Sequence, residues 1–275
     1  MDRNLNEYKP IEERLGQIGV NKLGEKMEII KCYPDYRVDV KFLDGKDCII
    51  NIKYSNFRSG VAKNYNRVEY GYNGYLGQGP YETIDRYNLN DKGKAKPSKV
   101  FNVWVSMHRR AGNYSGEKPS YKDVSVCEEW WCFQNFAKWY EENLYDSKDI
   151  PLCLDKDILY PGNKIYSPQT CRLVPDPINQ LFKSPPIKNS ELPIGVFRNS
   201  NKDKNKYSTV ALQRLDENNI IRKFKYSSDD VIWLFNKYKE ARENYVRDMA
   251  ELYKDILVNE IYHALKAYSF DKYNI

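Results

Sequence analysis

The chain has 275 residues, of which 41% are hydrophobic and 30% charged, a composition typical of a globular protein with one large domain or two to three smaller ones. Its formal net charge is +6. No apolar run approaches the ~18–20 residues of a membrane span, and the N-terminal stretch lacks the apolar segment of a secretory signal. We therefore expect a cytoplasmic protein with no membrane partner.

Residues 26–57 are predicted to form strands of a small antiparallel β module. Three runs rich in β-branched and aromatic residues are separated by turn residues, Tyr33 to Tyr36 and then Asp44, Gly45 and Lys46. Asp-Gly between two such runs favours a hairpin. We expect this module to occupy the N-terminal part of the chain.

The next segment, residues 67–100, is rich in Gly, Tyr, Asn and Lys without sustained periodicity, which predicts a loop or linker. Two helices are then predicted. The first covers residues 100–110, and the second lies within residues 127–145. The second helix would place an aromatic stripe on one face, and we interpret this stripe as core. It consists of Trp130, Phe133, Phe136, Ala137 and Tyr140.

The positive charge is concentrated near the C-terminal end. Residues 183–226 contain ten Lys or Arg against four acidic residues, an excess equal to that of the whole chain. Such a segment attracts a polyanion, with a solvated basic loop as the plain alternative. Three short strands are predicted after Pro193, with turns at 201–205 and 216–219. One very long helix, or two in tandem, should follow from about Ser228.

The predicted fold class is therefore α+β. The predicted elements do not alternate as βαβ, and the sequence contains no Gly-rich phosphate loop. Both observations argue against nucleotide hydrolysis and dinucleotide binding. We expect four parts, namely a small β module, a linker, a central core with helices, and a three-stranded sheet with a long C-terminal helix. Their expected bounds are 1–66, 67–100, 101–182 and 183–275.

Two stretches resemble a family of bacteriophage-encoded HNH-like proteins. The first runs from Trp104 to Asn143, and the second from Leu154 to Phe182, including LDKDILYPGNKIYSPQTC. The match spans about 80 residues. The segment from Pro193, with three basic strands and a helix, more loosely resembles the ethylene-response-factor type of DNA-binding domain, which lays a three-stranded sheet in the major groove.

The resemblance implies a ββα-metal nuclease core in which a hairpin and a helix hold one divalent cation, Mg²⁺ or Mn²⁺. Asp155 takes the position of the metal-binding Asp, and Asn179 that of the last ligand. Lys156 stands at the general-base position, where it could instead contact phosphate. Asn163 matches the residue that orients the base, and Asp157 or Asn163 would orient water.

Several residues depart from the family pattern. Lys156 replaces a histidine, and a solvated lysine near pKa ~10.4 stays charged at neutral pH, so it is a poor base. His108 is interpreted as a surface or packing residue, with an approach to the metal site as the alternative. Ala111 stands where the family has Cys. Because no Cys-x-x-Cys pair exists either, we expect free thiols in a reducing compartment and do not expect zinc.

The sequence leaves three functions open. The first is a DNA-binding protein with an HNH-like core that acts as a metal-dependent endonuclease on double-stranded DNA. The second is a non-catalytic DNA-binding regulator or a factor against host defence, and the third is a protein-interaction module that uses the C-terminal helix. The charged corner at 155–157 could also be a plain turn. The residues expected to bind DNA are Arg198, Arg214, Arg222 and Lys225.

Overall fold

The structure is a computed structural model, and it describes residues 7–112, 123–182, 191–199 and 206–273. The turn expected at 201–205 lies outside these ranges, as do four of the ten basic residues of the segment 183–226 (Lys183, Lys188, Lys202 and Lys204). The chain forms two compact units, each with its own core. The first unit comprises Met1–Lys122 with Glu128–Lys138, and the second comprises Asp123–Cys127 with Trp139–Ile275. The four domain bounds expected from the sequence stay a prediction.

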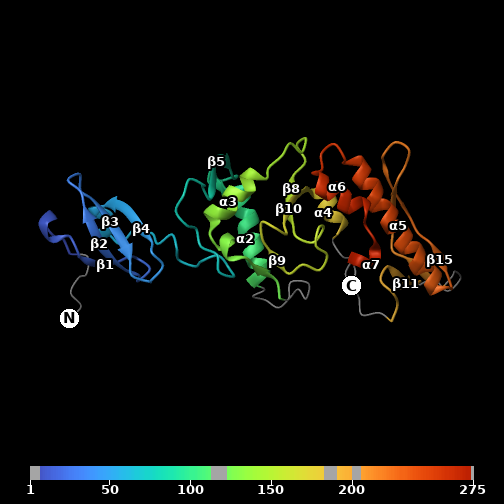
Figure 1. Ribbon diagram of the computed structural model, residues 1–275, viewed down its shortest axis with the longest axis horizontal. Helices are drawn as coiled ribbons and strands as arrows, with labels where there is room; N and C mark the ends of the chain where they lie inside the picture. Colours follow the sequence, from blue (N-terminus) through green and yellow to red (C-terminus); the bar gives the residue numbers. More distant parts are fainter. Residues whose placement is uncertain (1–6, 113–122, 183–190, 200–205, 274–275) are drawn as a thin grey trace. The chain divides into compact units, whose positions relative to one another are not determined.

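The first unit begins with a four-stranded antiparallel sheet in the order β1-β2-β3-β4 (Figure 1). Alternate residues of β3 point into the core, where Val38, Val40 and Phe42 are fully buried. The three strands predicted from the hydrophobic pattern are present, together with a short additional strand and two short helices. The elements are η1 (Ile11–Glu13), β1 (Ile18–Val20), β2 (Lys26–Cys32), β3 (Arg37–Phe42), β4 (Ile49–Lys53) and α1 (Tyr54–Arg58).

The segment expected to be a linker contains ordered structure. A hairpin of β5 (Ile84–Leu89) and β6 (Ala95–Pro97) lies within it. Before this hairpin the chain packs so tightly that a Cβ on Gly77 would lie 2.3 Å from the sulfur of Cys132. The glycines that suggested a flexible loop therefore allow close packing against the helical part of the same unit.

Both central helices are present, as α2 (Lys99–Gly112) and as η3 (Glu128–Trp131) followed by α3 (Phe133–Glu142). The aromatic stripe of the second helix is buried, as predicted. In the core, the indole nitrogen of Trp104 donates to the carbonyl of Trp130 at 2.8 Å, so the polar edge of this buried side chain is satisfied.

The second unit contains a hairpin followed directly by a helix. Strands β8 (Leu152–Asp155) and β10 (Arg172–Pro175) pair antiparallel, and α4 (Asp176–Leu181) begins at the residue after β10. The long connection between the two strands carries β9 (Ile165–Tyr166), which pairs in parallel with β7 (Ser125–Val126).

The C-terminal part has five short strands where three were expected. The second predicted strand is divided after Thr209, which is joined to Tyr226 by two hydrogen bonds. The last strand, β15, lies at Ser227–Ser228, where the helix was expected to begin. One sheet has the order β11-β12-β15, and the other is the hairpin β13-β14. Their bounds are β11 (Val196–Arg198), β12 (Tyr207–Thr209), β13 (Leu212–Leu215), β14 (Ile221–Phe224) and β15 (Ser227–Ser228).

Three helices stand where one very long helix or two in tandem were expected: α5 (Val231–Leu252), α6 (Asn259–Lys266) and the short α7 (Phe270–Tyr273). Asp230 caps α5 by accepting from the backbone nitrogen of Trp233 at 2.9 Å. After α5 the chain turns back, so that Ile261 and Leu265 pack in one cluster with Met249. A continuous helix would carry these apolar residues away from that core.

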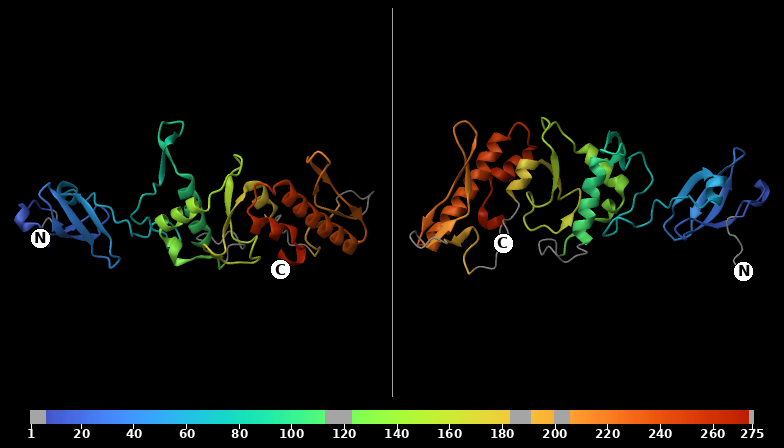
Figure 2. Two further views of the ribbon diagram at one scale, coloured as in Figure 1. Left: turned by 45° about the horizontal axis from the view of Figure 1, so that its top comes forward. Right: turned by 180° about the vertical axis from the view of Figure 1, so that it is seen from behind.

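The hairpin β13-β14 lies beside α5, as both views show in orange and red (Figure 2). The chain contains both helices and strands, and the strands form open sheets without βαβ order. The fold class is therefore α+β, as predicted. Among the described residues, no helix combines the length and apolar character needed to cross a membrane.

Candidate functional site

Asp155 is the last residue of β8 and lies opposite Arg172 of β10. Its Oδ1 accepts hydrogen bonds from the backbone nitrogens of Asp157, at 2.9 Å, and Ile158, at 2.8 Å. The carboxylate therefore closes the tight turn that follows the strand. This geometry explains why an acidic residue stands at the end of β8, whether or not a metal also binds there.

Burial governs the electrostatics of this carboxyl group. Asp155 is only 8% exposed, and desolvation raises its pKa, while the two backbone hydrogen bonds act in the opposite direction. With Oδ1 committed to the turn, at most one carboxylate oxygen is left for a cation.

Lys156 is held inside the loop. Its ammonium lies 2.6 Å from Oδ1 of Asp157 and 2.6 Å from the carbonyl oxygen of Asn163, and 5.9 Å from the ring centre of Tyr166. The side chain is 10% exposed. Two of the three N–H donors of the ammonium are thus used within the loop, and a contact with a DNA phosphate stays a prediction.

Asn163 uses its side-chain amide within the same loop. The Nδ2 group donates to the carbonyls of Lys156, at 3.1 Å, and Ile165, at 2.7 Å, and Oδ1 accepts from the backbone nitrogen of Ile165 at 3.0 Å. Together with the ammonium of Lys156, the amide holds the two sides of the loop together. Its expected role in orienting a base or water is not visible in these contacts.

Asn179 lies on α4 and is half-buried. This helix packs against β8 and β10, and the thiol of Cys153 donates to Oδ1 of Asp176 at 3.3 Å, which links the first strand to the helix. In this arrangement of β8, β10 and α4, Asp155 lies at the end of a strand and Asn179 lies on the helix.

Over the described ranges of the chain, no three His, Cys, Asp or Glu side chains form a group that could hold a metal ion. Mg²⁺ usually takes one or two carboxylates together with waters and substrate phosphates. One oxygen of a nearly buried carboxylate is a poor fit to that pattern, so we derive no chemical step through a metal. The Mg²⁺ or Mn²⁺ requirement stays a prediction.

The four expected DNA-binding residues are exposed on the C-terminal strands or directly after them. Three of these cations lie over aromatic rings of neighbouring strands at 5.3–5.5 Å, an arrangement that holds a long side chain against the sheet. The pairs are Arg198 with Tyr207, Arg214 with Phe224, and Lys225 with Phe197.

Strand register places two of these arginines together. Arg214 of β13 lies directly opposite Arg222 of β14, on the side of the hairpin that also carries the pair Leu212 and Phe224. Since successive strand residues point to opposite faces, Lys223 points to the other side. The sequence analysis did not include Lys223 or the turn residue Asp216 among the DNA-binding residues, and the carboxylate of Asp216 pairs with Arg222 at 2.7 Å.

No family model, curated protein or solved structure matches this chain. The assignment of a function therefore depends on the chain's own residues and their geometry.

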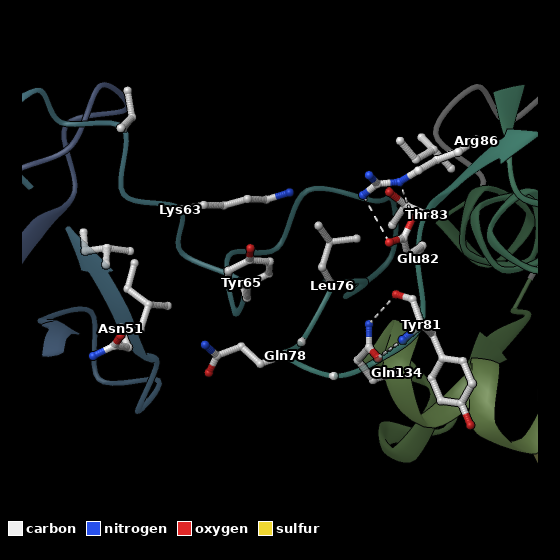
Figure 3. Close-up of a pocket in the computed structure, with 16 residues that line it drawn as sticks. Asn51, Lys63, Tyr65, Leu76, Gln78, Tyr81, Glu82, Thr83, Arg86 and Gln134 are labelled. Atoms are coloured by element: carbon white, nitrogen blue, oxygen red, sulfur yellow. Dashed lines mark hydrogen bonds and ion pairs between the residues drawn. The ribbon is translucent and has the colours of Figure 1, made fainter. Parts of the chain in front are cut away.

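The first unit contains an open groove of about 600 Å³, lined by the end of the N-terminal sheet and the segment that follows it (Figure 3). Some of its polar side chains are paired with each other or with the backbone. The amide of Gln134 exchanges two hydrogen bonds of 3.0 Å with the backbone of Tyr81, and Arg86 pairs with Glu82 at 2.8 Å.

His108 is a core residue, in agreement with its interpretation as a packing residue. Its ring is fully buried, lies 4.6 Å from the ring of Trp104, and contacts the carbonyl oxygen of Trp130 through Nε2 at 3.0 Å. Nδ1 has no hydrogen-bond partner among the described residues. Burial lowers the pKa of this imidazole to about 4.

His108 is expected to make the first unit sensitive to acid. The unfolded chain binds a proton near the ordinary pKa of ~6.5 and the folded chain only near 4, so stability falls as pH drops from 6.5 to 4. The expected loss is about 3 kcal/mol at 1.36 kcal/mol per pKa unit. Urea unfolding between these pH values should show this loss, and a smaller one in His108→Gln. Equal pH dependence in the two proteins would contradict the assignment.

Proposed function

We propose that this protein binds double-stranded DNA through its C-terminal strands, with the loop at 155–163 serving as a structural part of the core. The observation that carries the proposal is the cross-strand pair of exposed arginines, Arg214 and Arg222. Like charges directly opposite each other destabilise a sheet, and a bound polyanion would remove that cost.

The other candidate residues extend the same basic surface. Arg198 ends β11 and Lys225 directly follows β14. Both rest on aromatic rings, and neither has an acidic partner in the described part of the chain. Positive charge on short strands packed beside a helix is the arrangement that the resemblance to ethylene-response-factor domains implies. Because Arg214 and Arg222 share the hairpin face of Leu212 and Phe224, which packs toward α5, we propose the exposed turn end of the hairpin as the interface rather than the free face of the sheet.

The biological role proposed with this activity is that of a non-catalytic regulator or a phage factor against host defence. All six cysteines are free thiols, which suits a reducing compartment, and we propose the host cytoplasm as the location. A protein partner on the C-terminal helices would have to use residues outside the buried clusters, such as Ile232 and Trp233 at the start of α5.

A second candidate is hydrolysis of a phosphodiester by an HNH-type core. It is favoured by one observation, the hairpin β8-β10 followed by α4, with Asp155 and Asn179 at the positions that the resemblance implies. Against it stands Lys156, whose ammonium is engaged within the loop and which replaces the expected histidine base. We therefore place binding before cleavage.

A nicking assay separates the two candidates. Supercoiled plasmid incubated with the protein and either Mg²⁺ or Mn²⁺ is expected to stay supercoiled while its gel mobility is retarded. Accumulation of nicked circles by the wild type, lost in Asp155→Asn, would show that the protein is a nuclease. The Asn variant is suitable because its amide oxygen can still accept the two backbone hydrogen bonds of the turn.

A further inference from the structure

The turn end of the hairpin β13-β14 carries two arginines and one aspartate. Arg214 and Arg222 form a direct cross-strand pair, and Asp216 lies in the turn that joins the strands. The Nε atom of Arg222 lies 2.7 Å from Oδ2 of Asp216. Arg214 has no ion pair within the described part of the chain, so the carboxylate serves only one of the two arginines.

Asp216 is held in place by the turn itself. Its Oδ1 accepts from the backbone nitrogens of Asn218, at 3.0 Å, and Ile220, at 2.9 Å. The hydrogen bond from Ile220 and that from Arg222 hold the pKa of this carboxyl group below its usual range, so it remains an anion at neutral pH. A fixed negative charge thus stands beside one guanidinium of the pair.

The guanidinium groups point apart along the hairpin, Arg222 toward Asp216 at the turn and Arg214 toward Phe224, so a shared phosphate requires the two side chains to turn toward each other. Arginine presents its N–H donors in a planar fork that matches phosphate oxygens, and two forks on one face can hold the same group. The ring of Phe224, 5.5 Å from the guanidinium carbon of Arg214, keeps that side chain along the strand. Arg222 is 58% exposed despite its ion pair, so solvent and a ligand can reach it.

We propose that Arg214 and Arg222 together bind one backbone phosphate of DNA, and that Asp216 is an internal competitor that occupies Arg222 until the phosphate displaces it. This inference rests on the proposed function and adds a regulating residue to it. The carboxylate lowers affinity for any duplex, because binding must break its ion pair and bring a phosphate close to a like charge. It thereby limits non-specific binding.

The test compares Asp216→Asn with Glu217→Gln, which removes the same charge from the adjacent, exposed residue of the turn. Asparagine keeps the oxygen that accepts the two backbone hydrogen bonds, so the turn is retained. We expect Asp216→Asn to bind a mixed-sequence duplex about three- to tenfold more tightly than the wild type. Glu217→Gln should change affinity by less than about twofold.

A second arm adds Arg222→Gln, which should abolish the gain of Asp216→Asn, whereas a simple charge effect would persist. Equal gains in Asp216→Asn and Glu217→Gln, or a gain that survives Arg222→Gln, would overturn the competitor role while leaving DNA binding intact. If neither the wild type nor Asp216→Asn binds duplex at low salt, both this inference and the proposed function are wrong. Far-ultraviolet circular dichroism of each variant checks that the fold is retained.

Discussion

Replacing the four candidate DNA-binding residues by alanine is expected to weaken duplex binding by at least about 100-fold at ~0.1 M salt. Each cation that neutralises a phosphate releases a counterion, so the slope of log K against log[salt] should fall in magnitude by about 0.9 for every phosphate that is no longer neutralised. The replaced residues are Arg198, Arg214, Arg222 and Lys225.

The matched control removes the same charge from another surface. Four exposed lysines of the N-terminal sheet module and its connections form no ion pair among the described residues, and their replacement lowers the net charge equally. We expect this control to bind DNA nearly as well as the wild type. Equal weakening in both variants would show that binding depends on net charge and not on the C-terminal strands. The control residues are Lys22, Lys26, Lys46 and Lys53.

Asp155→Ala is expected to lower the free energy of unfolding by about 2–4 kcal/mol, because two backbone N–H groups lose their acceptor at a buried turn. Asp155→Asn keeps the acceptor, so its cost should be below about 1 kcal/mol. Denaturant unfolding of the two variants measures this difference directly.

The same pair of variants distinguishes a structural residue from a catalytic one. If the two substitutions cost equal stability, the hydrogen bonds from Asp157 and Ile158 are not what Asp155 supplies. If instead both variants retain full stability, the aspartate has no structural role and its place at the end of β8 would favour the nuclease candidate.

The α+β class and most elements could be predicted because local pattern determines them. Alternation in β3 and the helical spacing around Trp104 are properties of short windows of sequence. The division of the C-terminal strands could not be predicted, because it depends on hydrogen bonds between Thr209 and Tyr226, which are distant in sequence. The turn after α5 likewise depends on a tertiary core that a helical repeat does not reveal.

The candidate site likewise could be predicted only in part from the sequence. The acidic corner and the basic strands are visible as patterns of residue type, but burial and hydrogen-bond partners are not. Lys156 resembles a phosphate ligand in the sequence, whereas in the structure its ammonium lies between Asp157 and the carbonyl of Asn163. Strand register, which pairs Arg214 with Arg222, is a long-range property that composition does not contain.

The most direct test of the account is the salt dependence of duplex binding by the wild-type protein. Fluorescence anisotropy with a labelled duplex of about 20 base pairs, measured between about 50 and 200 mM KCl, should give a linear fall of log K with log[salt] and a slope of about −3 or steeper. A protein that leaves the anisotropy unchanged at the lowest salt, or whose affinity does not respond to salt, would contradict DNA binding by the C-terminal strands.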